Sequence, residues 1–166
     1  MASRAVGPLV RTIIFTVLAP GTVTIYVPYR LLPGGDFDLG AGRYVGIPLI
    51  AFGAAIYLWC AWNFAWVGLG TPAPIDPPKK LVARGLYRHI RNPMYVGVLN
   101  VLLGEALFFQ SLRVLGFALF ALAASHLFVI SYEEPTLRRK FGADYEDYCR
   151  AVPRWIPRRK DIPPRG

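Results

Sequence analysis

Two ionisable side chains, Glu105 and His126, stand within otherwise apolar stretches of the sequence. Titratable groups at membrane depth are costly, and they often mark functional sites. The two residues fall on the two arms of an expected helical hairpin, where we expect them to lie at a similar depth. They would serve either as a buried Glu–His hydrogen bond that locks the hairpin or as proton acceptors beside a reacting group.

A second candidate pair, Glu133-Glu134, follows the last apolar run. In a chain with few acids, two adjacent carboxylates either form salt bridges with Arg88 or Arg91, or bind hydroxyl or ammonium groups of a ligand. We favour the second interpretation. Since His126 precedes Glu133 by roughly two helical turns, a regular α-helix would place both side chains on one face.

The basic stretch 79–97 carries groups suited to an anion. Arg91-Asn92-Pro93 leads into an apolar run, and proline is favourable at the start of a helix. The free N–H groups and the positive end of the helix dipole attract a carboxylate there. Tyr87 and Tyr95 offer flat surfaces for stacking. Set against the two glutamates, this stretch predicts a site for a ligand with a carboxylate, an ammonium, a ribose and a purine.

The elements that position these residues are expected to be membrane helices. Apolar residues make up 54% of the chain and charged residues 17%, against about 25% charged in soluble proteins. A bilayer span needs about 20 apolar residues. Four runs approach this length, and the last two are joined by a turn at 110–113, which predicts a short helical hairpin. These runs are residues 12–29, 44–67, 94–112 and 114–132.

The sequence therefore predicts an all-α polytopic membrane protein with about four transmembrane helices. Pro20-Gly21 is expected to kink the first span. In the second span, Trp59, Trp62 and Trp66 share one face, either as an interfacial aromatic belt or as the wall of a ligand pocket. Residues 134–150 show helical spacing of apolar side chains and predict one amphipathic helix at the cytoplasmic surface.

Charge asymmetry predicts the orientation. Most of the 19 lysines and arginines fall in segments 79–91 and 138–160. The positive-inside rule places both segments, and both termini, in the cytoplasm, which suggests the inner membrane of a prokaryote. Anionic lipid headgroups account for the basic excess, so no nucleic-acid partner is needed. The two cysteines, Cys60 and Cys149, form neither a disulfide framework nor a metal site.

Two motifs, GLYRHIRNPMYVG and SYEEPTLRRKFGADYEDYCRAVPRWIP, resemble those of the isoprenylcysteine carboxyl methyltransferase and phospholipid methyltransferase family of membrane enzymes. The resemblance covers residues 79–157. It divides a single membrane domain, 1–166, into a two-span part at 1–70 and a cofactor-binding part at 79–157. It implies S-adenosylmethionine bound at the cytoplasmic face by Leu81, Val82, Tyr87, Arg91, Asn92, Pro93, Met94, Tyr95, Glu133 and Glu134.

The resemblance implies methyl transfer to a lipophilic or membrane-accessible acceptor with a carboxylate, amine or thiol group. An amine or a thiol must lose a proton, which makes Glu105 or His126 a candidate base. Val129 occupies the place of a substrate-facing arginine in the prenylcysteine enzymes, which disfavours a prenylcysteine substrate. The alternatives are a membrane sterol or steroid reductase that uses NADPH, and a membrane scaffold without catalytic activity.

Overall fold

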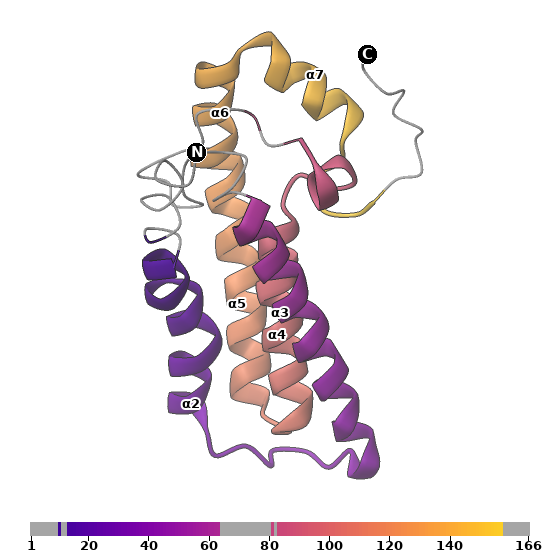
Figure 1. The fold of residues 1–166 in the computed structure, drawn as a ribbon. Helices are drawn as coiled ribbons and strands as arrows, with labels where there is room; N and C mark the ends of the chain where they lie inside the picture. The colour runs from indigo at the N-terminus through magenta and orange to yellow at the C-terminus, as the bar shows by residue number, and fades with distance from the viewer. Residues whose placement is uncertain (1–9, 11–12, 64–80, 82, 158–166) are drawn as a thin grey trace.

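The computed structural model describes residues 10, 13–63, 81 and 83–157, and its regular elements there are all helices (Figure 1). The first helix, Ile13–Leu31, ends in the segment α2, Val27–Leu31. A 3₁₀ turn, Gly40–Val45, leads into α3, Gly46–Asn63. After it come α4, Pro93–Phe108, and α5, Leu112–Phe128. The C-terminal helices are α6, Glu134–Phe141, and α7, Ala143–Ala151.

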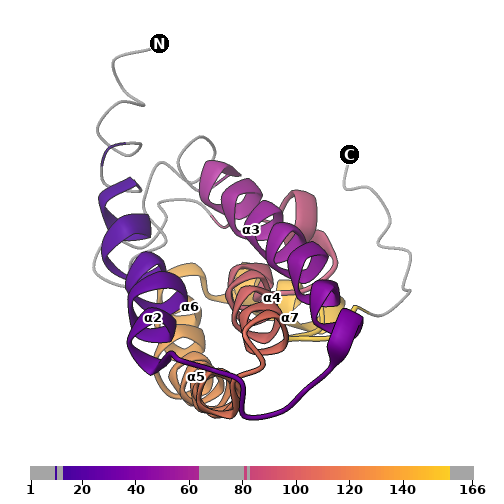
Figure 2. The ribbon, with the colours of Figure 1, turned by 90° about the horizontal axis from the view of Figure 1, so that it is seen from below.

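Three of these helical stretches are long and apolar enough to cross a membrane: Ile13–Leu31, Gly40–Asn63 and Leu112–Phe141. The apolar helix α4 is shorter. The predicted all-α, polytopic membrane fold is confirmed. Viewed along the bundle, α4 lies between α3 and α5, and the first helix lies beside α5 (Figure 2). The helix α4 therefore occupies the middle of the bundle.

Four glycines explain why α3 and α4 pack so closely. Gly53 faces Gly97, and Gly46 faces Gly104, as expected for antiparallel helices with matching seven-residue repeats. A β-carbon on Gly53 would lie 2.5 Å from the carbonyl oxygen of Gly97, and one on Gly97 would lie 2.8 Å from that of Gly53. Small residues let helix backbones approach in this way within a membrane, where van der Waals contact rather than the hydrophobic effect favours association.

The loop after the first helix is hydrogen-bonded to the α4–α5 turn at the end of the bundle opposite α7. The backbone N–H of Gly35 donates to the carbonyl oxygen of Gln110 at 3.0 Å, and that of Asp36 donates to the same oxygen at 2.9 Å. The Asp36 carboxylate accepts from the N–H of Leu112, the first residue of α5, at 2.8 Å. A carboxylate at a helix N-terminus satisfies a free donor and complements the helix dipole. This loop and the turn at 110–113 thus share one side of the bundle.

Two predicted element boundaries are wrong. The fourth span continues without a break through α6, so that Leu112–Phe141 forms one helical stretch of 30 residues. The predicted amphipathic helix 134–150 is instead divided at Gly142, whose φ of 53° lies in the left-handed region that glycine adopts without steric cost. As a result α7 turns away from the axis of α5 and covers the end of the bundle (Figure 1). Trp66 and the proline-rich connector at 68–78 lie outside the described residues.

Candidate functional site

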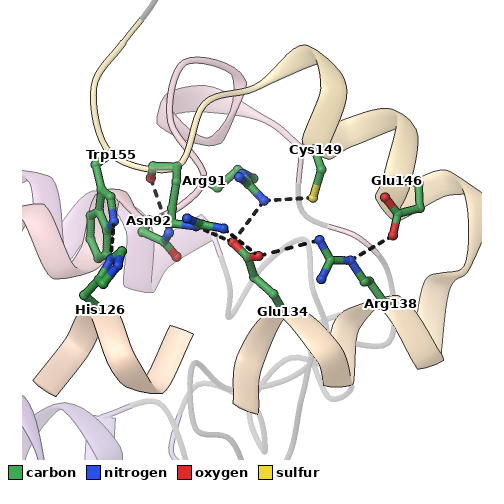
Figure 3. Close-up of polar contacts among 9 residues, drawn as sticks. Arg91, Asn92, His126, Glu134, Arg138, Glu146, Cys149 and Trp155 are labelled. Atoms are coloured by element: carbon green, nitrogen blue, oxygen red, sulfur yellow. Dashed lines mark hydrogen bonds and ion pairs between the residues drawn. The ribbon is translucent and has the colours of Figure 1, made fainter. Parts of the chain in front are cut away.

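A buried carboxylate, Glu134, joins three separate parts of the chain at one end of the bundle (Figure 3). Its side chain is only 4% exposed. Arg91, just before α4, donates from Nη1 to Oε1 at 3.0 Å. Arg154, after α7, donates to both carboxylate oxygens, at 2.6 and 2.9 Å, and Arg138 approaches Oε2 at 3.7 Å. A buried charge needs such partners. Of the two interpretations of the Glu pair, Glu134 fits the salt bridge.

Glu133 points elsewhere because α5 reaches it through a π-helical turn, Val129–Glu133. A π turn bonds residue i to i+5 and so accommodates one residue more than an α turn. The face that His126 occupies is therefore continued by Glu134, not by Glu133. The contacts agree, since the consecutive residues Arg154 and Trp155 bond Glu134 and His126. The predicted shared face of His126 and Glu133 is wrong for this reason.

The Glu133 carboxylate instead lines a cavity of about 490 Å³. Its Oε2 accepts a hydrogen bond from the Tyr95 hydroxyl at 3.1 Å. Arg91 lines the same cavity, and its Nε is buried without a hydrogen-bond partner among the described residues. One end of the cavity is therefore lined by a carboxylate and a guanidinium group. Such a pair suits the ammonium and carboxylate groups of an amino-acid moiety.

The remaining walls of the cavity are apolar and come from the membrane helices. The first helix contributes Phe15 and Val23, and α5 contributes Phe117 and Phe120. Phe117 lies on α5 about 24 Å before Glu133 at 1.5 Å of rise per residue, so the cavity is long and changes from polar to apolar along the bundle. Its full lining is Phe15, Ala19, Pro20, Val23, Val27, Tyr57, Tyr87, Arg91, Asn92, Met94, Tyr95, Val98, Phe117, Phe120, Ala121, Ala124, Ser125 and Glu133.

A C-terminal strap, residues 152–157, closes the polar end of the bundle. The Arg91 N–H donates to the Pro153 carbonyl oxygen at 2.9 Å, and Asn92 Nδ2 donates to the Arg154 carbonyl oxygen at 3.3 Å. The predicted helix start at Pro93 is confirmed. However, the Arg91 N–H that the sequence suggested for a ligand anion binds the strap. The hydrogen bonds that Arg154 donates to Glu134 raise the pKa of that arginine, which keeps its charge in place.

Tyr87 is buried in the short 3₁₀ turn Gly85–Arg88 and belongs to a small core with Cys60. Its carbonyl oxygen accepts from the Tyr148 hydroxyl of α7 at 2.7 Å. Burial raises the pKa of both tyrosines, so each stays a neutral phenol. A second contact of α7 comes from Cys149, whose Sγ accepts from Arg91 Nη1 at 2.8 Å. The helix α7 therefore fixes both Tyr87 and Arg91 at the cavity.

The predicted pairing of Glu105 with His126 is wrong. Glu105 lies about one turn from the C-terminal end of α4, whereas His126 lies about four turns into α5, so they differ by roughly 16 Å along the hairpin. Glu105 Oε2 is buried without a partner among the described residues. His126 Nδ1 accepts from Trp155 Nε1 at 3.1 Å. A neutral histidine so bonded carries its proton on Nε2 and can only donate there.

Neither Glu105 nor His126 lines the cavity, so neither is placed to touch a reacting group there. Of the ten residues that the resemblance assigned to the cofactor, six line the cavity: Tyr87, Arg91, Asn92, Met94, Tyr95 and Glu133. Pro93 and Glu134 are buried behind it, and Leu81 is half-buried outside its lining. Val82 lies outside the described residues.

Sequence reasoning missed the strap side chains. Arg154 and Trp155 stood in the motif that was matched, but their contacts could not be read from it. Trp155 also packs edge-on against Tyr95, with ring centroids 6.2 Å apart. The aromatic residues of the first helix and α5 that line the cavity were missed too, because in a uniformly apolar span nothing distinguishes a cavity-facing side chain from a lipid-facing one.

Comparison with known proteins agrees with this geometry. Residues 42–144 match the family model described as phospholipid methyltransferase. A stretch of 75 residues is 39% identical to methanethiol S-methyltransferase 2 of Bradyrhizobium diazoefficiens. That stretch covers 44% of this chain and 27% of the relative, so the match spans only about a quarter of that longer protein. No solved structure matches the chain.

The family model spans more than half of the chain, from the start of α3 to the junction of α6 and α7. It thus includes the α4 start with Arg91, the hairpin, and both glutamates. The methyl donor of this family is S-adenosylmethionine. The chain belongs to the phospholipid methyltransferase family of integral membrane proteins.

Proposed function

We propose that this protein transfers the methyl group of S-adenosylmethionine to the thiol group of an acceptor that enters from the bilayer. The observation that carries the proposal is the cavity, which joins Arg91, Tyr95 and Glu133 at its polar end to apolar walls within the membrane helices. The family favours a methyltransferase over a sterol reductase or a scaffold. The thiol is suggested by the relative that is named for methanethiol S-methylation.

The residues present fit the methyl donor. Arg91, whose side chain lines the cavity, would bind its carboxylate, and Glu133 would bind its ammonium group. Tyr87 and Tyr95 would pack against its rings. Asn92 and Met94 complete this end of the cavity, while Pro93 and Glu134 support it from behind. Leu81 and Val82 remain predicted contacts.

The cofactor supplies an activated methyl group on a positively charged sulfur. When bound, it would supply this methyl group to the acceptor sulfur, and the acceptor would first lose its thiol proton to solvent. The protein's task is then to align the acceptor sulfur with the methyl group and to exclude water from the apolar part of the cavity.

The orientation in the membrane forms part of the proposal. Arg88, Arg138 and Arg139 belong to the elements at the same end of the bundle as Glu134, whereas the loop at Asp36 and the turn at 110–113 lie at the opposite end. We propose that the end with the basic residues faces the cytoplasm, where the positive-inside rule places them and where the cofactor is available. A topology reporter inserted at either end of the bundle would test this orientation, because it shows which side of the membrane that end faces.

The experiment is cofactor binding and methyl transfer by the purified chain in detergent. We expect S-adenosylmethionine to bind in calorimetry and a labelled methyl group to appear on ethanethiol. Arg91→Ala should weaken binding by about tenfold or more, since it removes a charge-assisted hydrogen bond. Arg113→Ala is the matched control, because this exposed arginine lies at the opposite end of the bundle. Binding of NADPH in place of S-adenosylmethionine would refute the proposal. Methyl transfer to amines but not to thiols would refute the choice of acceptor.

A further inference from the structure

One hydroxyl group in the wall of the cavity is not used by the fold. Ser125 of α5 lines the cavity, and its half-buried side chain has no hydrogen-bond partner among the described residues. Hydroxyl groups within helices commonly bond the carbonyl oxygen one turn earlier. Thr22 and Thr24 do so in the first helix, and the Ser131 hydroxyl donates to the carbonyl oxygen of Leu127. Ser125 therefore keeps a donor and an acceptor available to a molecule in the cavity.

The surface around this hydroxyl is small and apolar. Ala121 and Ala124 line the cavity beside Ser125, and Phe117 and Phe120 line it farther from the polar end. Of the α5 residues in the lining, Ser125 alone has a polar side chain. The alanines leave room for a ligand atom next to the hydroxyl, and few other groups there compete for a hydrogen bond with that atom.

Ser125 lies where the polar and apolar parts of the cavity meet. It precedes Glu133 by about 12 Å along the helix at 1.5 Å of rise per residue, and long side chains in helices point back toward the N-terminus. The next residue, His126, packs against Trp155 with ring centroids 6.0 Å apart, and Trp155 packs against Tyr95. Ser125 is therefore close to the depth of the Tyr95 ring, and the Glu133 carboxylate extends toward that depth.

This depth suits the reacting atoms. If the amino-acid group of the methyl donor is bound at the polar end, its sulfonium lies three bonds from the α-carbon. An acceptor atom in line with the methyl group, about 3–3.5 Å beyond it, would then lie toward Ser125. Two other hydroxyl groups in the lining are already bonded, since Tyr57 bonds Thr16 and Tyr95 bonds Glu133. The Ser125 hydroxyl is thus available to the acceptor.

We propose that the Ser125 hydroxyl donates a hydrogen bond to the sulfur of the methyl acceptor and holds that sulfur as a thiolate. A hydrogen bond to the charged form of a group favours that form, and apolar walls strengthen the effect because water does not compete. Ser125 does not take the thiol proton, which passes to solvent, and it forms no bond to the methyl carbon. This inference rests on the proposed methyltransferase function and adds the residue that holds the acceptor.

The first test is the pH profile of kcat for ethanethiol. In Ser125→Ala the acid-side limb should move up by about one pH unit, so that kcat falls about tenfold near neutral pH and recovers to within about twofold at alkaline pH. Ser131→Ala is the matched control, because that exposed hydroxyl bonds its own helix, and its profile should not change. A loss of the same size at every pH, no loss at any pH, or the same shift in Ser131→Ala would overturn the inference.

The second test does not depend on turnover. Ser125→Cys and the control Ser131→Cys are labelled with N-ethylmaleimide in detergent, and labelling is mapped by mass spectrometry. S-adenosylhomocysteine, the demethylated cofactor, should change the labelling rate of Ser125→Cys by less than about twofold, and adding ethyl methyl sulfide, the expected product, should slow it about tenfold near saturation. Such protection, without an effect on Ser131→Cys, supports the inference even if ethanethiol is not methylated, in which case the proposed function alone fails. Full protection by S-adenosylhomocysteine alone, or none by the sulfide, overturns the inference.

Discussion

The two adjacent glutamates should respond in opposite ways to the same chemical change. Glu133→Gln and Glu134→Gln each remove one negative charge while keeping the size of the side chain. The π-helical turn directs Glu133 into the cavity and Glu134 into the arginine cluster. We therefore expect the first variant to lose cofactor affinity and the second to lose stability.

The stability loss for Glu134→Gln follows from the burial of its partners. Arg91 is 12% exposed, so removal of the carboxylate leaves a largely buried cation with no charged partner among the described residues. Breaking a buried pair in this way costs about 3–5 kcal/mol. Arg154 and Arg138 are 32% and 45% exposed and can turn to solvent, so the loss of their ion pairs adds little to the loss of stability. We expect about 3 kcal/mol, which for a chain of this size lowers Tm by roughly 6–12 °C.

The affinity loss for Glu133→Gln follows from its isolation. Its carboxylate accepts from Tyr95, and it forms no ion pair within the described part of the chain. Removing its charge should therefore change the free energy of unfolding by less than about 1 kcal/mol. Loss of a charge-assisted hydrogen bond to the cofactor ammonium costs about 1.5–3 kcal/mol, which raises the Kd of S-adenosylmethionine about 10- to 100-fold.

Both quantities can be measured on the same detergent preparations. Tryptophan fluorescence during heating gives Tm, and calorimetry with S-adenosylmethionine gives Kd at a temperature where both variants are folded. For Glu134→Gln we expect less than about a tenfold change in Kd, because Arg91 keeps its contact with Cys149. If Glu133→Gln is as unstable as Glu134→Gln, or if Glu134→Gln shows the larger loss of affinity, the division of roles by the π-helical turn is refuted.

Three further predictions concern the elements around the site. Gly53→Val should lower the free energy of unfolding by about 1–3 kcal/mol, because it forces α3 and α4 apart. Gly116→Val, where an added β-carbon meets nothing within 4 Å, should leave Tm in detergent unchanged. His126→Gln should leave kcat and its pH profile unchanged, because Trp155 occupies the one nitrogen that could accept a proton. Loss of the acid-side limb of the profile, which a general base would produce, would contradict this. Asp36→Ala should lower the free energy of unfolding by about 1 kcal/mol, because it removes the carboxylate that accepts from the Leu112 N–H at the start of α5. Denaturant titration measures this change, and no change would show that this hydrogen bond contributes nothing.

The residues at the polar end of the cavity could be singled out largely from sequence because they carry distinctive chemistry. Arg91, Tyr95 and Glu133 are polar or aromatic groups beside apolar runs, and their types alone suggest a zwitterionic ligand. Pro93 marked the start of α4 correctly for a local reason, since proline is favourable at the first position of a helix. These inferences needed only short segments of chain and no knowledge of how the helices pack.

The errors arose where helical register extends over many residues. The π-helical turn at Val129–Glu133 inserts one residue, and no sequence pattern announced it. The expected pairing of Glu105 with His126 took the two residues to be equally far from the turn at 110–113, whereas His126 lies about three helical turns farther from it than Glu105 does. The facing pairs formed by Gly53 with Gly97 and Gly46 with Gly104 were visible in the sequence, but which helices they would join depends on the fold.

The separation of the two motifs along the sequence has a structural reason. The first motif supplies Arg91 and the second supplies Glu134 and Arg154, and these three residues meet in one ion-pair cluster. The α4–α5 hairpin lies between the motifs. Its helices need only the length that returns the chain to the same end of the bundle. Many apolar sequences satisfy that requirement, whereas the cluster needs particular charges. Substitutions among lipid-facing residues of the hairpin should therefore be tolerated, while a single inserted residue before Glu133 should rotate both glutamates and abolish cofactor binding.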